Sequence, residues 1–373
     1  MDESHRNTPR TGKKTTTLGV GGKRMVLSVG IMDLEIEQQP QVLQGLLDEG
    51  GDAVREVARA IRGRRPRHVV IAARGTSDNA ARYAKYVLGA HLGLPVGLAV
   101  PSLHTIYKQP PQLGDALVIG ISQSGQSPDV VTVIDDARQQ GGTTLAITND
   151  PDSPLARSAE FCVELRAGTE HAVAATKTYT AQLMVVAMLS AALGTNGGQW
   201  SELANVPELV NEALRRSTQM GDVAAKHRGA DRFLVLGRGF NYCTAFELAL
   251  KIKETCLAMA EPYSIADLLH GPIAMLDSGF PAIVIAPPGP ATQAFAPVLE
   301  LLDKRGADTL VLSSDPNVAS RASSWVSLPD GMSPWLSPLV SIVPGQRFAA
   351  ALAEAKGHDP ANPRGLSKVT LTL

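Results

Sequence analysis

A repeated pattern constrains the fold of this chain more than any other feature of its sequence. The apolar segment His68–Ala73 is followed by an Arg-Gly pair and then by a helical pattern, and Arg232–Gly237 is followed by the same pair and pattern without a gap. Apolar segments that alternate with helices are typical of parallel sheets with helices on both faces. We therefore predict an α/β protein of two tandem domains, which repeat one structural unit.

Shifts in composition predict where the domains begin and end. Residues 1–31 are rich in Thr, Gly, Lys and Arg and have no periodic apolar pattern, so we expect a disordered extension there. The first domain is predicted over residues 32–199, and it ends in a glycine-rich turn segment. The second domain is predicted over residues 200–357, and residues 358–373 follow as a C-terminal tail.

Composition also excludes several classes of function. The chain has 373 residues, 44% hydrophobic content and a net charge of -1, so it has no electrostatic signature of a nucleic-acid partner. It has neither an apolar run long enough to span a membrane nor the apolar core of a secretory signal, so we expect a cytoplasmic protein with no membrane partner. Its three cysteines are far apart and show no ligand spacing, which argues against zinc and against a disulfide framework.

A serine-rich turn between a predicted strand and a predicted helix is the first candidate site. The strand covers residues 116–121 and the helix starts at Pro128. N–H groups at a helix start favour an anion, and hydroxyl groups add donors without adding charge. This pattern predicts a phosphate cradle, although a serine-rich turn with an N-cap is also possible. The polar side chains of the turn are Ser122, Gln123, Ser124 and Ser127.

A second polar turn is predicted at residues 74–77, after the strand His68–Ala73. Because ligands bind beyond the carboxyl ends of parallel strands, Thr76 and Ser77 should lie at the same edge of the sheet as the serine-rich turn.

The second copy lacks these serines but carries a cluster of titratable groups. Glu247, Lys251 and Glu254 are spaced four and three apart, so they share one face of a helix, which could also be a solvated face with an ion pair. His270 follows before Gly-Pro, where a turn residue is also possible. A base, a cation and a ring-protonating group are what the enolisation of a sugar needs.

These segments resemble the sugar isomerase (SIS) family from about Met32 to the C-terminus. The chain is most similar to the isomerase half of glutamine–fructose-6-phosphate amidotransferase (glucosamine-6-phosphate synthase) and to stand-alone SIS-type glucosamine-6-phosphate deaminases. The resemblance implies two tandem SIS domains of the flavodoxin-like three-layer type, with no metal or organic cofactor. The motifs that carry it are residues 74–77, 122–125, 167–177, 249–254, 270–272 and 363–368.

The resemblance also implies a substrate and a role for each residue. An amino-sugar 6-phosphate would bind, and Glu254 would move a proton between C1 and C2. His270 would help to open the sugar ring from the neighbouring subunit, which implies a homodimer with shared active sites. Lys251 and Glu247 would assist, and Lys368 on the tail that closes the site would contact the open-chain sugar. The implied substrate-binding residues are Gly75, Thr76, Ser77, Ser122, Gln123, Ser124, Ser127, Val173, Ala175 and Ser367.

Two departures from the synthase affect the expected reaction. Ala175 stands where the synthase has serine, and the first cysteine is Cys162, so we expect no glutaminase nucleophile and no ammonia taken from glutamine through this chain. The segment at residues 363–370 is more similar to the stand-alone group, which favours breakdown of an amino sugar.

Three functions stay open at this point. The first is conversion of glucosamine 6-phosphate to fructose 6-phosphate and ammonia. The second is elimination of water at C3 of N-acetylglucosamine 6-phosphate, and the third is non-catalytic sensing of a sugar phosphate.

Overall fold

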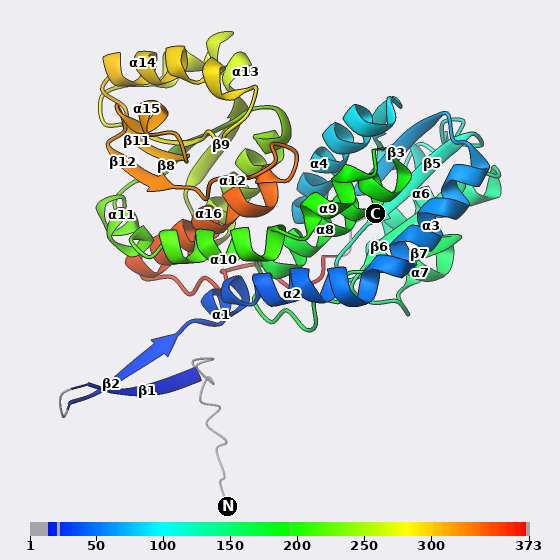
Figure 1. Ribbon diagram of the computed structural model, residues 1–373, viewed down its shortest axis with the longest axis horizontal. Helices are drawn as coiled ribbons and strands as arrows, with labels where there is room; N and C mark the ends of the chain where they lie inside the picture. Colours follow the sequence, from blue (N-terminus) through cyan, green and yellow to red (C-terminus); the bar gives the residue numbers. More distant parts are fainter. Residues whose placement is uncertain (1–13, 21–22, 195, 371–373) are drawn as a thin grey trace, which may run out of the picture.

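Each half of the chain is built around one five-stranded sheet whose strands are all parallel (Figure 1). The structure is a computed structural model and describes residues 14–20, 23–194 and 196–370. The first sheet has the order β4-β3-β5-β6-β7 and the second the order β9-β8-β10-β11-β12. The two orders are equivalent along the chain, so the predicted duplicated α/β architecture is confirmed.

The strands of both sheets are short. Those of the first sheet are β3 His68–Ala73, β4 Val96–Leu98, β5 Ala116–Ile121, β6 Thr143–Thr148 and β7 Phe161–Glu164. Those of the second are β8 Arg232–Gly237, β9 Met259–Ser264, β10 Pro281–Ile285, β11 Asp308–Ser313 and β12 Ser324–Ser327. Every residue of β5 and β6 is buried, as expected for central parallel strands that helices cover on both faces.

Helices fill the space around the sheets. The first half contains α1 Ile31–Glu37, α2 Gln39–Gly45, the π-helical turn Leu46–Gly50, α3 Gly51–Arg64, α4 Gly75–Leu92, α5 Pro101–Thr105, α6 Pro128–Gln139, α7 Pro154–Ser158 and α8 Lys177–Leu193. The rest contains α9 Gly198–Leu203, α10 Val206–Arg216, α11 Met220–Lys226, α12 Tyr242–Cys256, α13 Ile265–Leu269, α14 Ala296–Lys304, α15 Pro316–Ala319 and α16 Ser337–Ala355. No helix among the described residues is long and apolar enough to cross a membrane.

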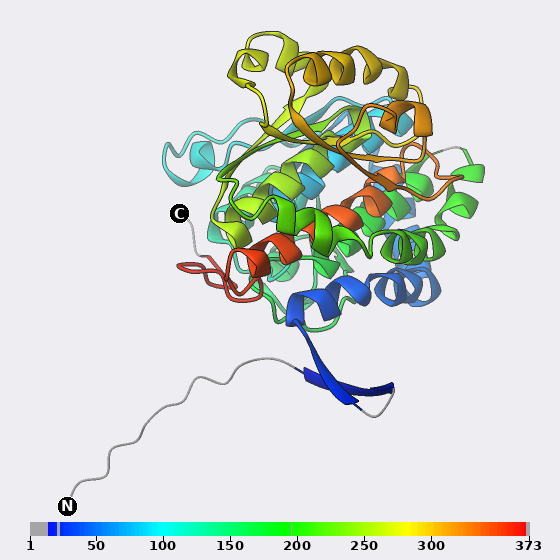
Figure 2. The ribbon, with the colours of Figure 1, turned by 90° about the vertical axis from the view of Figure 1, so that its left-hand side faces the viewer.

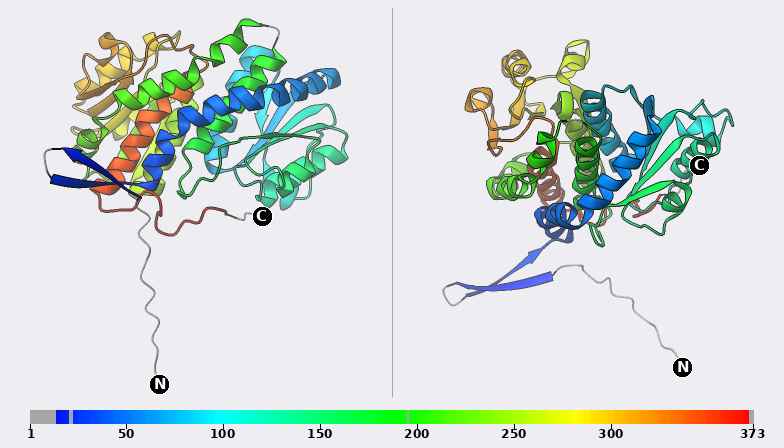
Figure 3. Two further views of the ribbon diagram at one scale, coloured as in Figure 1. Left: turned by 60° about the horizontal axis from the view of Figure 1, so that its bottom comes forward. Right: turned by 45° about the vertical axis from the view of Figure 1, so that its right-hand side comes forward.

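The inner helices join the two halves through one continuous apolar core (Figure 3). α8 packs against α3 and α4 of the first half, α16 packs against α10, α11 and α12, and α4 and α12 pack against each other. The large side chains Tyr83, Tyr179 and Phe348 are fully buried in this shared core. Two smaller apolar clusters, one for each half, lie outside the shared core. The α4–α12 contact therefore brings the carboxyl edge of the first sheet against the second half.

The structure bears on two predictions, the disorder of the N-terminal extension and the boundary between the domains. The predicted disorder of residues 1–31 does not hold where the structure describes them, because β1 Lys14–Val20 and β2 Lys23–Val29 pair as an antiparallel hairpin that projects from the rest of the chain (Figure 2). The first segment contains three Thr and the second contains two Val, residue types that favour strands, and the polar composition hid that preference. The rest of the extension, residues 1–13 and 21–22, lies outside the described residues. The predicted boundary between residues 199 and 200 falls inside α9, so the domain limits stay predictions.

Candidate active site

The seam between α4 and α12 positions the candidate site. Gly75 has φ +53°, a conformation that glycine adopts without steric cost, so the chain passes from β3 into α4 within one residue. Thr76 and Ser77 therefore lie in the first turn of α4, where the sequence predicted a separate turn. Ser77 Oγ accepts a hydrogen bond from Gln182 Nε2 of α8 at 2.9 Å, and its own hydrogen stays available for another acceptor.

The serine-rich turn between β5 and α6 forms one wall of the site. Gly125 has φ +63°, and a Cβ there would lie 2.1 Å from Ser153 Oγ, so only glycine fits. Ser122 Oγ accepts from Gly125 N–H at 3.1 Å, and Ser124 Oγ accepts from Gln126 N–H at 3.3 Å. These two backbone donors are thus used locally, and the hydroxyl hydrogens are left to donate to a ligand.

Charged side chains of α12 form the opposite wall. Lys251 is buried, and its Nζ lies 2.6 Å from Glu254 Oε2 and 3.4 Å from Glu247 Oε1. Thr76 connects them across the seam, because its Oγ1 accepts from Lys251 Nζ and donates to Glu247 Oε1, each at 3.1 Å. Glu247 also accepts from Asn79 Nδ2 at 2.8 Å. The alternative of a solvated helix face is therefore wrong for Glu247 and Lys251, and the Glu254 side chain is only 23% exposed.

Burial controls the protonation of this cluster. It raises the pKa of Glu247 from 4.5 to about 7, against the opposing effects of the Lys251 charge and the Asn79 hydrogen bond. Burial alone would lower the pKa of Lys251, but the carboxylates of Glu247 and Glu254 outweigh that effect and raise it. Lys251 therefore keeps its charge, whereas Glu247 titrates near neutral pH.

The raised pKa of Glu247 predicts that the free energy of unfolding falls as pH rises through about 7. The unfolded chain loses this proton near pH 4.5 and the folded chain holds it until about pH 7, so protonation favours the folded state. This contribution to the free energy of unfolding, up to about 3 kcal/mol, is complete below pH 4.5 and lost above about pH 7. Chemical denaturation across this range should show the decline, and Glu247→Gln should flatten it. The exposed control Glu56→Gln should keep it, and equal slopes in all three proteins would assign the effect to another group.

The loop before α8 and the C-terminal tail close the remaining side. Val173 N–H donates to Ala361 O at 2.9 Å, which ties the loop to the tail. Lys368 Nζ donates to Glu170 Oε2 at 2.8 Å and to Ala172 O at 2.6 Å. Burial would raise the pKa of Glu170, but the Lys368 charge and hydrogen bonds outweigh it and lower that pKa. Charge-assisted hydrogen bonds thus hold the tail on the loop.

A cavity of about 340 Å³ lies between these walls. All the substrate-binding residues predicted from the sequence border it, as do Lys251, Glu254 and Lys368, although their roles stay predictions. Glu247 lies behind Thr76 and is buried rather than at the cavity surface. The cavity is bordered by Arg74, Gly75, Thr76, Ser77, Ser122, Gln123, Ser124, Ser127, Val173, Ala175, Lys251, Glu254, Leu366, Ser367, Lys368, Val369 and Thr370.

The structure does not bring His270 to the cavity of its own chain. This residue directly follows α13, which lies beside α14 in the second half (Figure 1), and it is exposed. The large apolar side chains of Leu269 and Met275, in the same segment of the chain, are 51% and 45% exposed. The entry of His270 into the site of a neighbouring subunit therefore stays a prediction.

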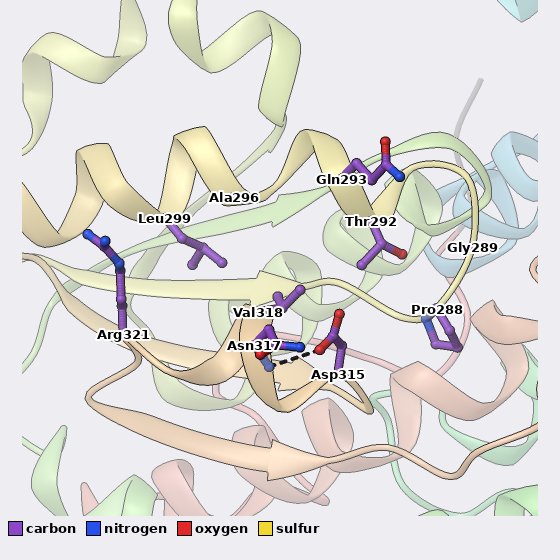
Figure 4. A pocket seen from close by; sticks show the side chains of 10 residues that line it. All are labelled: Pro288, Gly289, Thr292, Gln293, Ala296, Leu299, Asp315, Asn317, Val318 and Arg321. Carbon is purple, nitrogen blue, oxygen red and sulfur yellow. Dashed lines mark hydrogen bonds between the residues drawn. The ribbon is translucent and has the colours of Figure 1, made fainter.

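A larger cavity of about 450 Å³ lies in the second half, beside α14 and α15 (Figure 4). Arg321 lies at one end of it, Asp315 and Asn317 lie between, and Pro288 and Gly289 lie at the other end. Pro288 stands where the first copy has Ser124. Because the described residues around it include no lysine–carboxylate cluster like that of α12, we assign the active site to the smaller cavity.

Three residues that matter to the geometry were not singled out in the sequence. Arg74 borders the cavity, and Glu170 holds Lys368. Both lie inside motifs that carried the resemblance, so their position was a usable signal. Glu35 of α1 accepts from His171 N–H at 2.5 Å and supports the loop from behind. These partners are 136 residues apart, and no local pattern could have revealed the contact.

Comparison with known proteins assigns the fold to a family. A family model described as "SIS domain" matches residues 64–192 and 228–353, one match around each sheet. A glutamine–fructose-6-phosphate aminotransferase (isomerizing) from Methanothermobacter thermautotrophicus is 34% identical over 339 residues, which cover 90% of this chain and 56% of that protein. The chain thus spans about half the length of the curated relatives that it matches.

Solved structures agree with this assignment. A protein from Silicibacter pomeroyi DSS-3, provisionally assigned as a phosphosugar isomerase, is 36% identical, with a TM-score of 0.80 over 89% of this chain and 100% of that chain. A glucosamine-6-phosphate deaminase from Thermotoga maritima has a TM-score of 0.73 at 20% identity, over 92% of this chain and 100% of that chain, a likeness that shows the fold alone. Since the family match covers more than half of the sequence, the protein belongs to the SIS domain family, with one SIS domain in each half.

Proposed function

We propose that the protein is an enzyme that opens the ring of an amino-sugar 6-phosphate and removes the proton at C2. The position of Glu254 carries this proposal. Its carboxylate borders the same cavity as the serine cradle and is paired with the buried Lys251 at 2.6 Å. One cavity thus joins a wall suited to an anion and a wall suited to proton transfer, which is the combination that enolisation of a phosphorylated sugar requires.

The proposed reaction converts glucosamine 6-phosphate and water to fructose 6-phosphate and ammonia. After ring opening, Glu254 takes the C2 proton, and the Lys251 ammonium stabilises the negative charge that develops on the C1 oxygen. Return of a proton to C1, with transfer of one proton from nitrogen to the C1 oxygen, leaves a C1 hydroxyl group and a double bond between C2 and nitrogen. Water then adds to this imine carbon, and the nitrogen leaves as ammonia. The relative from Methanothermobacter thermautotrophicus is named for action on fructose 6-phosphate, which supports the substrate class.

The buried charge cluster argues against pure sensing of a sugar phosphate. Burying Lys251 and Glu247 costs solvation free energy, and binding a phosphate at the other wall does not require either group. A catalytic role explains why both are kept. Elimination of water at C3 of N-acetylglucosamine 6-phosphate would begin with the same proton abstraction, and the experiment below distinguishes it.

We also propose a homodimer in which His270 of one subunit enters the cavity of the other. The proposal rests on three observations: His270 is exposed, it is absent from its own cavity, and exposed Leu269 and Met275 lie near it. Contact with a second subunit would cover both apolar side chains.

The test is product analysis with two substrates. The protein is incubated separately with glucosamine 6-phosphate and N-acetylglucosamine 6-phosphate, and ammonia, fructose 6-phosphate and ultraviolet absorbance are measured. We expect ammonia and fructose 6-phosphate in equal amounts from the first substrate only. An absorbing unsaturated product from the acetylated sugar would instead establish elimination. Tight binding of either sugar without any product or C2 proton exchange would identify a sensor.

A further inference from the structure

A buried carboxylate holds an arginine at the edge of the active-site cavity. Arg74 Nε donates to Asp129 Oδ2 at 2.6 Å, and the Arg74 side chain is 50% exposed whereas Asp129 is fully buried. Asp129 Oδ1 also accepts from Val130 N–H at 2.9 Å, which fixes the carboxylate in the first turn of α6. Asp129 follows Ser127 by two residues, so the pair spans from the end of β3 to the helix that begins beside the cradle.

Arg74 differs from the other cations of this cavity. Lys251 is paired with Glu247 and Glu254, and Lys368 is bonded to Glu170. The contact with Asp129 uses only the Nε–H of Arg74, and within the described ranges its two terminal NH2 groups have no further hydrogen bond. A guanidinium held in this way keeps two donors in a fixed plane for a bidentate contact with an oxyanion.

The chemistry of the cradle explains what this charge is for. The hydroxyls of Ser122, Ser124 and Ser127 supply donors without charge, and a phosphate monoester carries close to two negative charges at neutral pH. A hydrogen bond with one ionised partner is roughly twice as strong as a neutral one, so these hydroxyls contribute to phosphate binding but leave its charge without a counterion. A cationic donor would add a Coulombic attraction to the phosphate that the hydroxyl group of a free sugar cannot return.

We infer that Arg74 is the charged anchor for the phosphate of the substrate and selects phosphorylated sugars, with Asp129 as its positioning residue. This inference rests on the proposed function, because it names the group that recognises the proposed substrate. It adds a charged contact at the passage from β3 into α4, where Thr76 and Ser77 would supply neutral ones.

The test uses Arg74→Gln and a matched control. Arg238 directly follows β8 at the equivalent place in the second copy and is exposed, so Arg238→Gln makes the same chemical change away from the active-site cavity. Calorimetry with inorganic phosphate and steady-state kinetics with glucosamine 6-phosphate are measured for the wild type and both variants. We expect Arg74→Gln to raise the Kd for phosphate and the KM by about 10- to 100-fold. The kcat should change by less than about threefold, because the contact is present in the ground and transition states alike. Arg238→Gln should match the wild type.

Two further variants separate anchoring from a structural role. Arg74→Lys keeps the charge but lacks the planar fork, so its KM should lie between those of the wild type and Arg74→Gln. Asp129→Ala should raise KM although Asp129 does not border the cavity, and Asp129→Asn should recover part of the loss because its amide oxygen can still accept from Arg74 Nε. If the Arg74–Asp129 pair had only a structural role, these variants would melt at lower temperatures, but their KM values would not follow the order given above.

The outcomes are distinguishable. Unchanged phosphate affinity in a folded Arg74→Gln or Arg74→Lys protein would overturn the inference and leave the proposed function intact, and so would a loss confined to kcat. A wild-type protein that binds neither phosphate nor the sugar phosphate would overturn the proposed function, and this inference with it.

Discussion

Replacing Glu254 with glutamine is expected to reduce turnover by about 10²- to 10⁴-fold, the usual contribution of a general base. Glutamine has nearly the same shape but cannot take a proton from C2. It also keeps an oxygen near Lys251, whose Nζ lies 2.6 Å from the carboxylate in the wild type. Substrate affinity should therefore change much less than kcat.

The decisive measurement for this variant is exchange of the C2 proton with deuterated water, followed by magnetic resonance. The wild type should exchange it, and Glu254→Gln should lose the exchange together with turnover. Glu56→Gln changes the same side chain at an exposed position on α3 and should behave as the wild type. If Glu254→Gln exchanges the proton as fast as the wild type, then the base is another group, and Glu247 is the next candidate.

The second large effect is recovery of activity from two inactive proteins. His270→Ala should lose ring opening, and Glu254→Gln should lose proton abstraction, each by about 10²-fold or more. If each site takes Glu254 from one subunit and His270 from the other, then a mixed dimer contains one intact site. Free exchange of subunits in an equal mixture should restore about one quarter of the wild-type activity, because half of the dimers are mixed and each has one intact site.

The control for this experiment carries both substitutions on one chain. A preparation of that double variant cannot form an intact site and should stay inactive under the same exchange conditions. Mass spectrometry of the intact dimer verifies that subunits have exchanged. Verified mixed dimers without recovered activity would contradict the shared site.

The sequence predicted the sheets well because parallel strands covered on both faces read as continuous apolar runs. The predicted limits of β3 and β5 coincide with the observed ones, and the two halves share one strand order, as expected for a repeated unit. The pairing of α4 with α12 could not be predicted, since it depends on how the halves pack and no local pattern records it.

In the candidate site, too, local features could be predicted from the sequence and long-range contacts could not. The serines of the cradle were recognisable because helix starts and hydroxyl donors leave a local signature. The contact of Thr76 with Glu247 spans 171 residues, and that of Lys368 with Glu170 spans 198. Both depend on burial, which spacing alone does not reveal. For this reason the spacing of Glu247 and Lys251 allowed a solvated face, which the structure rules out.

Because residues of both copies border the cavity, neither half of the chain contains a complete candidate site. One copy supplies the serines and the other supplies Glu254 and Lys251, while one apolar core runs through both. The first copy lacks the lysine–carboxylate cluster and the second lacks the serines. A loss of these groups in one copy therefore cannot be compensated by the other copy. A gene broken between the repeats would encode two fragments that regain activity only by reassembling around their common interior. The duplication thus ended with two specialised partners in one polypeptide, each of which is chemically incomplete alone.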